Sequence, residues 1–328
     1  LPWRQKDFPI RWGEEFANDA PLHLEVGFGD GRFTLRRALE HPNENFVALE
    51  ISTTSMSRLL HKLRKSKIEN VRLLKLGAQF AVKHLFDKGA LESITVNFPD
   101  PWPKDKHVDH RLLQRSFYYV AANRLRTGGT IRLATDHPEY LAFAKEEAVS
   151  SNVFTLRDDV APEAVFATKY ALKWKAQGKP LYYQTFESLG SDAPATDIYP
   201  LNSERSCMPH ALLTGQLPKN PEFTKQVMPY EDGYVIVHEL LQSLGSDNDE
   251  DASDTHSKER WLFRVTIDEP DLKQQVLIIA KRREDDEYIV RFEPFGDPVL
   301  TKAARGAVHA VTEWLLSFPS LHLKARNY

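Results

Sequence analysis

Short apolar runs alternate with longer amphipathic runs from Leu22 to Phe186, and this alternation limits the folds open to the chain. The short runs are rich in β-branched and other apolar residues, as buried strands are. They cover residues 22–26, 46–49, 72–76, 93–96, 130–134, 153–156 and 181–186. Helical stretches such as Ser55–Lys65 and Leu112–Arg124 separate the earlier runs. This pattern predicts an α/β fold with a doubly wound, mainly parallel sheet.

The composition changes after this region, which indicates two domains. We expect a first domain over residues 1–189, a linker over 190–220 rich in Gly, Ser, Pro, Asp and Asn, and a smaller α+β domain over 221–328. Strands of the second domain are expected at 223–228, 233–241, 260–267, 274–280 and 287–292, followed by a helix at 302–317. The acidic segment 245–256 has almost nothing to bury, so we interpret it as a solvated insertion.

Charge and cysteine content narrow the function classes. The net charge of −3 hides an asymmetry, because residues 1–189 hold 28 Lys and Arg against 23 Asp and Glu, whereas residues 190–328 hold 15 against 23. The first part can therefore meet a polyanion. A single cysteine, Cys207, cannot form an intrachain disulfide, which fits a reducing cytoplasm. With no apolar run of spanning length and no signal-peptide pattern, we expect a cytoplasmic protein without a membrane partner.

Three glycines follow the first predicted strand in the segment Glu25–Gly31, EVGFGDG. Glycines at alternate positions let the backbone approach a ligand, and the helix that follows offers free N–H groups. The spacing is G-x-G-x-G rather than the G-x-G-x-x-G of a dinucleotide site, which favours an adenosyl ligand without a pyrophosphate. Glu50 ends the second strand, where a carboxylate can accept hydrogen bonds from a ribose diol. The alternative is that Glu50 caps the next helix.

The run NFPDPWPK, residues 97–104, follows the fourth predicted strand. Its prolines forbid further sheet or helix, so the chain forms a rigid loop at the carboxyl end of the strand. This loop carries a carboxylate, Asp100, a flat ring, Trp102, and a cation, Lys104, where ligands bind in open α/β sheets. A proline-stiffened surface turn without function is the alternative.

Together these segments resemble the bacterial tRNA (guanine(46)-N7)-methyltransferases, which use S-adenosylmethionine. The resemblance spans residues 24–171. It rests on EVGFGDG, Glu50, NFPDPWPK, the basic tail Lys106-His107 to His110-Arg111, Ala134-Thr135-Asp136 and Thr168-Lys169-Tyr170. It implies a Rossmann-like S-adenosylmethionine-dependent methyltransferase fold and tRNA as the partner. Longer members of the family carry an additional carboxyl-terminal region, as this chain does.

The resemblance also implies roles for single residues. Cofactor-binding residues would be Glu25, Gly27, Gly29, Glu50 and Asp100. Asp100 and Asp136 would be catalytic, and the substrate-binding residues would be Lys104, His107, Arg111, Asp136 and Thr168. Four positions depart from the family pattern: Ala78 replaces an acid near the adenine, Asp109 and His110 replace two cations, and Ala171 replaces the glutamate of a Thr-x-x-Glu motif.

The chemistry of guanine N7 fits these residues. N7 carries an unprotonated lone pair, so its methylation needs positioning and charge compensation rather than a general base. Carboxylates such as Asp100 and Asp136 can accept hydrogen bonds from the N1–H and N2–H₂ edge of guanine. For Lys104, Lys106 and Arg111 we favour phosphate contact over a solvated loop.

Other interpretations stay open at this point. Trp102 and Trp174 could stack on bases or pack in a core. His107 and His110 lack the partners of a zinc site, so we expect no metal. The departures at Ala78 and Ala171 leave room for a catalytically weakened tRNA-binding protein, and a methyltransferase for a protein or metabolite is a third possibility. The oligomeric state and the role of the second domain are not determined by the sequence.

Overall fold

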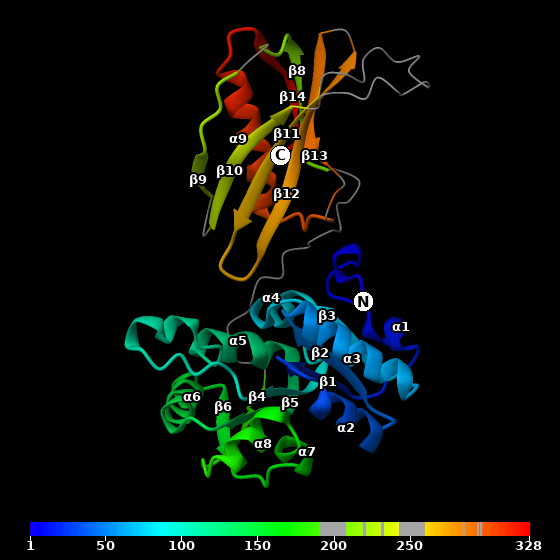
Figure 1. The fold of residues 1–328 in the computed structure, drawn as a ribbon, viewed down its shortest axis with the longest axis vertical. Coiled ribbons are helices and arrows are strands. Elements are labelled where there is room, and N and C mark those ends of the chain that lie inside the picture. Colours follow the sequence, from blue (N-terminus) through cyan, green and yellow to red (C-terminus); the bar gives the residue numbers. More distant parts are fainter. Residues whose placement is uncertain are drawn as a thin grey trace. The chain divides into compact units, whose positions relative to one another are not determined.

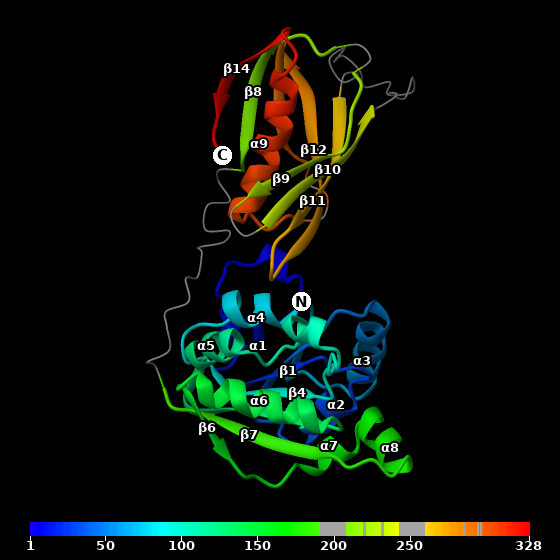
Figure 2. The ribbon, with the colours of Figure 1, turned by 90° about the vertical axis from the view of Figure 1, so that its left-hand side faces the viewer.

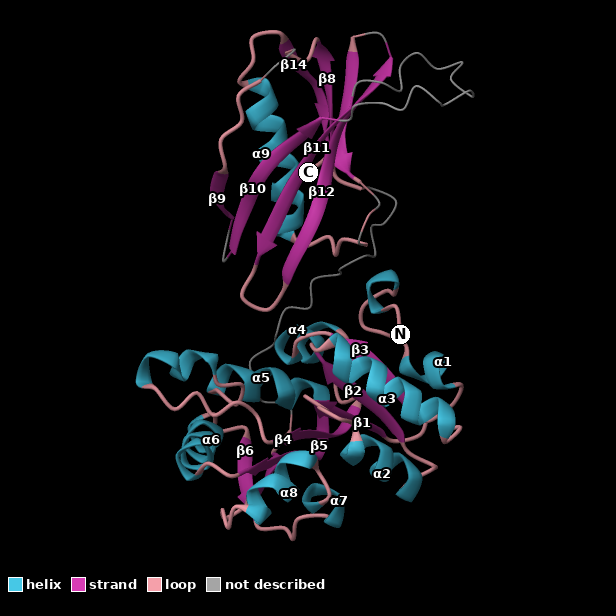
Figure 3. Cartoon of the chain, viewed as in Figure 1, coloured by secondary structure: helices cyan, strands magenta, loops and turns pink. Residues whose placement is uncertain are grey.

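The computed structural model describes residues 1–190, 208–218, 221–230, 233–242, 260–284, 286–293, 295 and 297–328. Two compact units make up the chain, one from Leu1–Trp3 and Phe8–Ile198, the other from Arg4–Asp7 and Tyr199–Tyr328. Helices and strands alternate in the first unit, whereas strands dominate the second (Figure 3).

The first unit is built on a seven-stranded sheet. Its strands are β1 (Leu22–Val26), β2 (Asn45–Glu50), β3 (Val71–Lys75), β4 (Leu91–Asn97), β5 (Leu125–Thr135), β6 (Phe154–Arg157) and β7 (Tyr182–Ser188). They lie in the order β3-β2-β1-β4-β5-β7-β6. Strands β1 to β5 are parallel, and β7 runs antiparallel to both β5 and β6. The predicted doubly wound, mainly parallel sheet is therefore confirmed.

Helices cover both faces of this sheet (Figure 1). The helical segments of residues 1–190 are η1 (Trp3–Gln5), α1 (Trp12–Phe16), α2 (Arg32–Glu40), α3 (Thr53–Lys65), α4 (Ala78–His84), η2 (Asp105–His110), α5 (Arg115–Arg124), α6 (Pro138–Ser150), α7 (Glu163–Phe166) and α8 (Lys169–Ala176). Helices α4, α5 and α6 pack side by side, and α2 packs against α3 and α7. Because both faces are covered, the inner strands are buried on both sides; Val47, Ala48 and Leu49 of β2 are at most 1% exposed.

The strand order reverses at β1, and this places the loops that follow β1, β2 and β4 close together. Strands β2 and β3 lie on one side of β1, and β4 and β5 lie on the other. Val26 at the end of β1 is in register with Leu49 of β2 and with Val96 of β4. The segments beginning at Gly27, Glu50 and Asn97 therefore leave the sheet at one edge. Open α/β sheets bind ligands at such a switch point.

The second unit is an antiparallel sheet with one long helix against one face, visible in Figure 2 as α9 lying across the strands. Its strands are β8 (His210–Gly215), β9 (Gln226–Tyr230), β10 (Gly233–Gln242), β11 (Arg260–Asp268), β12 (Lys273–Glu284), β13 (Glu287–Phe292) and β14 (Leu321–Arg326). The order is β14-β8-β13-β12-β11-β10-β9. Helix α9 (Lys302–Leu316) buries its apolar stripe, including Ala307, Val308 and Val311, in the core of this unit. The predicted α+β character of the second domain is confirmed.

Two strands of the second unit lie outside the predicted pattern. Strand β8 falls inside the range 190–220 that we expected to be a linker, and β14 follows the last predicted element. Both strands are short, and β8 is paired on either side by β13 and β14. Their strand conformation is fixed by these distant partners rather than by local sequence. The acidic segment 245–256 and residues 191–207 of the expected linker lie outside the described residues.

Candidate functional site

The glycine loop after β1 turns back onto the end of β2. Gly27, Gly29 and Gly31 have positive φ angles of 71°, 57° and 75°, which a residue with a Cβ adopts only under strain. The N–H groups of Gly27 and Phe28 both donate to the carbonyl oxygen of Leu49, at 2.9 and 3.2 Å. Gly31 then forms the N-cap of α2. The loop is thus held at the switch point by hydrogen bonds to the neighbouring strand.

The Glu50 carboxylate also holds the glycine loop by a hydrogen bond. Its Oε2 accepts from the Gly29 N–H at 3.0 Å, and its Oε1 accepts from the N–H groups of Ile51 at 2.9 Å and Ser52 at 3.1 Å. The side chain that caps α3 at its N-cap position is Ser52, which accepts from the Ser55 N–H. Glu50 therefore orders the loop where a ribose would lie, and its contact with the ribose remains a prediction.

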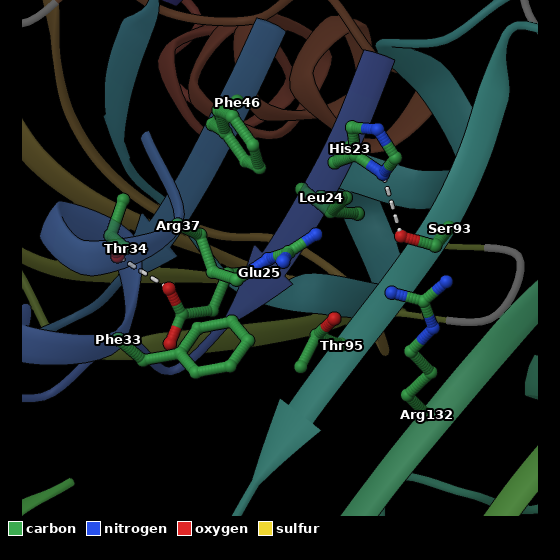
Figure 4. A pocket seen from close by; sticks show the side chains of 10 residues that line it. All are labelled: His23, Leu24, Glu25, Phe33, Thr34, Arg37, Phe46, Ser93, Thr95 and Arg132. Atoms are coloured by element: carbon green, nitrogen blue, oxygen red, sulfur yellow. Dashed lines mark hydrogen bonds between the residues drawn. The ribbon is translucent and has the colours of Figure 1, made fainter. Parts of the chain in front are cut away.

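Glu25 is a buried carboxyl group at the floor of the site. It points from β1 toward Thr34 of α2, whose hydroxyl donates to its Oε2 (Figure 4). Burial raises the pKa of Glu25 to about 7, and the negative charges of Asp30 and Glu50 act in the same direction. Hydrogen bonding from Thr34 opposes this pKa shift. Near neutral pH the group is thus poised between its neutral and ionised forms.

A cavity of about 110 Å³ joins the glycine loop to two distant segments. Its walls are formed by Glu25 and the loop residues 27–30, by Asn97 and Phe98, and by Thr168–Tyr170. A Cβ atom added at Gly27 or Gly29 would meet no protein atom within 4 Å, because these glycines border open space. The glycine loop therefore borders open space on the cavity side, where a ligand can approach its backbone. Four predicted site residues, Glu25, Gly27, Gly29 and Thr168, line it.

The proline-rich loop after β4 is backbone-strained at its two aromatic residues. Phe98 and Trp102 have φ angles of 53° and 43°, which are unusual for bulky side chains and concentrate at functional sites. The Phe98 N–H donates to the carbonyl of Ala134 at 2.7 Å, which ties the loop to β5. Asp100 lies further along the loop and is exposed; it is not among the residues that line the cavity. Its catalytic role remains a prediction.

The structure corrects the interpretation of Arg111. We expected this residue to contact phosphate, but it is only 8% exposed. Its guanidinium donates to the carbonyl oxygens of Pro101 and Trp102, at 3.0 and 3.2 Å, and lies 4.7 Å from the ring centre of Phe143. A guanidinium directed into the loop is not available to an RNA backbone. Arg111 instead holds the proline-rich loop in place.

The basic tail after this loop is arranged around Trp102. The rings of His107 and His110 lie 5.7 and 5.0 Å from the Trp102 ring, centre to centre. Trp102 is 37% exposed, so it is packed on one side only. Lys104 and Lys106 are exposed, as a phosphate contact requires. No cluster of three or more potential metal ligands occurs in the described part of the chain.

Thr168 lines the cavity at the start of α8, whereas Asp136 is not among the residues that line it. The Asp136 carboxylate follows β5 and lies 3.6 Å from the Nζ atom of Lys179. Thr168 is buried and forms the N-cap of α8, where its hydroxyl accepts from the Ala171 N–H and donates to the Val165 carbonyl. Ala171, at the position of the family's glutamate, is 1% exposed.

Sequence reasoning did not assign the residues that close the cavity. Asn97 and Phe98 belong to the run NFPDPWPK, in which only the acid, the Trp ring and the cation were assigned possible roles. Thr34 carries no sequence signal, because its partnership with Glu25 depends on how α2 packs over β1. Lys169 and Tyr170 reach the cavity from a segment about 140 residues downstream of the glycine loop. Only the folded chain brings these residues together.

Comparison with known proteins gives consistent matches. A family model described as "Putative methyltransferase" matches residues 19–184. The chain is 34% identical to the tRNA (guanine-N(7)-)-methyltransferase of Thermus thermophilus, over 96% of this chain and 95% of the relative. It is 37% identical to the enzyme of that name from Deinococcus radiodurans, over 90% of this chain and 89% of the relative. Both alignments extend across the two units.

In the described residues, no helix combines the length and the apolar character that a membrane crossing requires.

Proposed function

The chain belongs to the family of tRNA (guanine-N7)-methyltransferases, and from this premise we propose that it methylates N7 of guanosine 46 in the variable loop of tRNA, with S-adenosylmethionine as the methyl donor. The observation that carries the proposal is the cavity at the switch point of the sheet. It brings the glycine loop, the start of the proline-rich loop and the first turn of α8 to one space. Because a tRNA-modifying enzyme acts where tRNA is available, we also propose a cytoplasmic location.

The glycine loop and its two acids would hold the cofactor. Gly27 and Gly29 border open space and allow a ligand to approach the backbone closely. Glu50 lies beside them at the end of β2, where a ribose diol is recognised in related sheets. Glu25 lines the cavity, and its carboxyl group would meet the methionine end of the cofactor. When bound, S-adenosylmethionine supplies a methyl group activated by a positively charged sulfonium.

The remaining work of the site is positioning and charge compensation. Guanine N7 attacks through its own lone pair, so no residue has to remove a proton first. Asp100 is exposed on the proline-rich loop, and Asp136 follows the end of the adjoining strand β5. Carboxylates at these positions accept hydrogen bonds from the N1–H and N2–H₂ edge and offset the positive charge that forms on the base. Arg111 contributes indirectly by fixing the loop that carries Asp100.

The substrate side of the site is formed by polar residues around the proline-rich loop and α8. Lys104 is exposed at the end of this loop and would contact phosphate, and His107 packs against Trp102 of the same loop. Thr168 lines the cavity and would face the guanine.

The experiment is a methyl-transfer assay with position mapping. The protein is incubated with labelled S-adenosylmethionine and unmodified tRNA transcripts, and N7-methylguanosine is then mapped in the product. We expect label at guanosine 46, and none in a transcript with adenosine at that position. Label at another nucleotide would refute the position. Absence of label, with normal equilibrium binding of S-adenosylmethionine and tRNA, would favour the catalytically weakened RNA-binding protein.

A further inference from the structure

The segment Lys169–Pro180, which contains α8, is strongly cationic. It holds lysines at positions 169, 173, 175 and 179 and no acidic residue. All four lysines are exposed. Four positive charges within twelve residues, on a chain whose net charge is negative, form a local surface suited to a polyanion.

The helix geometry gathers part of this charge on one face. Ala171 is buried and marks the side of α8 that faces the body of the unit. With 3.6 residues per turn, Lys169 and Lys173 lie on the opposite side, and Tyr170 and Trp174 form the flank beside them. Tyr170 is 45% exposed. We call the four residues Lys169, Tyr170, Lys173 and Trp174 the α8 face.

Cations and aromatic rings are interleaved on and beside this face. The Nζ atoms of Lys173 and Lys179 lie 4.4 and 3.8 Å from the ring centre of Trp174, and that of Lys169 lies 6.0 Å from the ring centre of Tyr170. Lys179 is engaged with Asp136 as well. Surfaces that bind single-stranded nucleic acid combine lysines for the backbone with flat rings for bases in this way.

The α8 face begins at the rim of the cavity. Lys169 and Tyr170 are part of the cavity wall, and the Tyr170 ring lies 6.5 Å from that of Phe98 in the proline-rich loop. If the base of a nucleotide entered the cavity, the neighbouring nucleotides of its strand would lie near this rim, within reach of the α8 face.

We propose that the α8 face is a docking surface for the RNA strand next to the target guanosine, with Lys169 and Lys173 contacting phosphates and Tyr170 stacking on a base. The proposal deepens, and depends on, the function proposed above. It assigns RNA contact to exposed lysines of α8, whereas the Arg111 guanidinium is directed into the proline-rich loop.

The test compares two double variants that remove the same charge. Lys169→Ala/Lys173→Ala changes the α8 face, whereas Lys65→Ala/Lys88→Ala removes two exposed lysines at the end of α3 and in the turn after α4. Binding of full-length tRNA is measured over a range of salt concentrations. We expect the α8 variant to bind about tenfold more weakly and its salt slope, d log K/d log[salt], to fall in magnitude by about 1.5, corresponding to two lost phosphate contacts. The control variant should match the wild type.

Further measurements separate this inference from the proposed function. Lys169→Arg/Lys173→Arg should restore binding, and Lys173→Ala alone, which lies outside the cavity wall, should reduce the slope by about half as much. Equal tRNA affinity and salt slope in the α8 and control variants would overturn the inference while wild-type methylation of tRNA still supports the function. A loss of binding to anionic lipid vesicles without a loss of tRNA binding would also overturn it. If the wild type binds tRNA through α8 but methylates no guanosine, the function fails and the RNA-docking assignment stands.

Discussion

Because Glu25 is buried, we expect the free energy of unfolding of the protein to be lower at alkaline pH than at acidic pH. An acid with an ordinary pKa of 4.5 in the unfolded chain and about 7 in the folded chain is harder to ionise when folded. Ionisation of Glu25 therefore lowers the free energy of unfolding. This loss is absent well below pH 4.5, grows between pH 4.5 and 7, and is constant well above pH 7. That amount is about 3 kcal/mol. Glu25→Gln removes the charge and keeps an oxygen for the Thr34 hydroxyl.

We expect Glu25→Gln to raise the free energy of unfolding of the first unit by up to about 3 kcal/mol at pH 8, and by less than about 1 kcal/mol at pH 5. Because the chain has two units, unfolding in urea is followed by hydrogen–deuterium exchange of peptides from β1 and β4, which belong to the first unit. Glu69→Gln, at an exposed position, is the control and should change stability little at either pH. The same Glu25 variant should bind S-adenosylmethionine more weakly, since the carboxylate that faces the ligand is lost. A variant destabilised at pH 8, or stabilised equally at both pH values, would refute this reasoning.

Three further predictions concern single residues. Asp100→Ala should lower turnover about 100-fold while circular dichroism and the melting temperature stay close to wild type, because the side chain is exposed; near-normal activity would remove Asp100 from the mechanism. Arg111→Ala should lower kcat/KM for tRNA at least about tenfold, because the loop at Trp102 loses a hydrogen bond that holds it. The salt slope of tRNA binding should not change, because the guanidinium contacts loop carbonyls; a changed slope would mean that Arg111 does contact phosphate. Gly31→Ala should destabilise the first unit by about 2–4 kcal/mol in urea unfolding, because its φ is positive and its Cβ would lie 2.5 Å from a carbon of the buried Leu59; an unchanged midpoint would contradict the packing of α2 on α3.

Much of the fold was predictable because its signals are local. The predicted strands of the first domain overlap β1 to β7, since each buried strand of a parallel sheet needs a short apolar run. The predicted ends differ by a few residues. The antiparallel direction of β7 was not predicted, because direction depends on the partner strand and not on the apolar run itself. For the same reason β8, supported by β13 and β14, was assigned to the linker.

In the candidate site too, features that depend on local sequence were predictable and features that depend on tertiary contacts were not. The glycine spacing and the proline-rich run could be recognised from sequence because backbone conformation there depends on the residues themselves. The direction of a side chain could not. Arg111 sits in a basic tail, yet its guanidinium turns inward to carbonyls that the strained loop presents to it.

By itself, the sequence determined the residue types in each loop, the alternation of strands and helices, and the resemblance that points to methyl transfer on tRNA. The tertiary structure decided which of these loops share a cavity, which carboxyl group is buried beside Thr34, and which cations remain free to meet an RNA strand. The physical reason is that hydrogen bonding, burial and pKa depend on atoms brought close by the strand order, and segments such as Gly27–Asp30 and Thr168–Tyr170 become neighbours only when the sheet and its helices have formed.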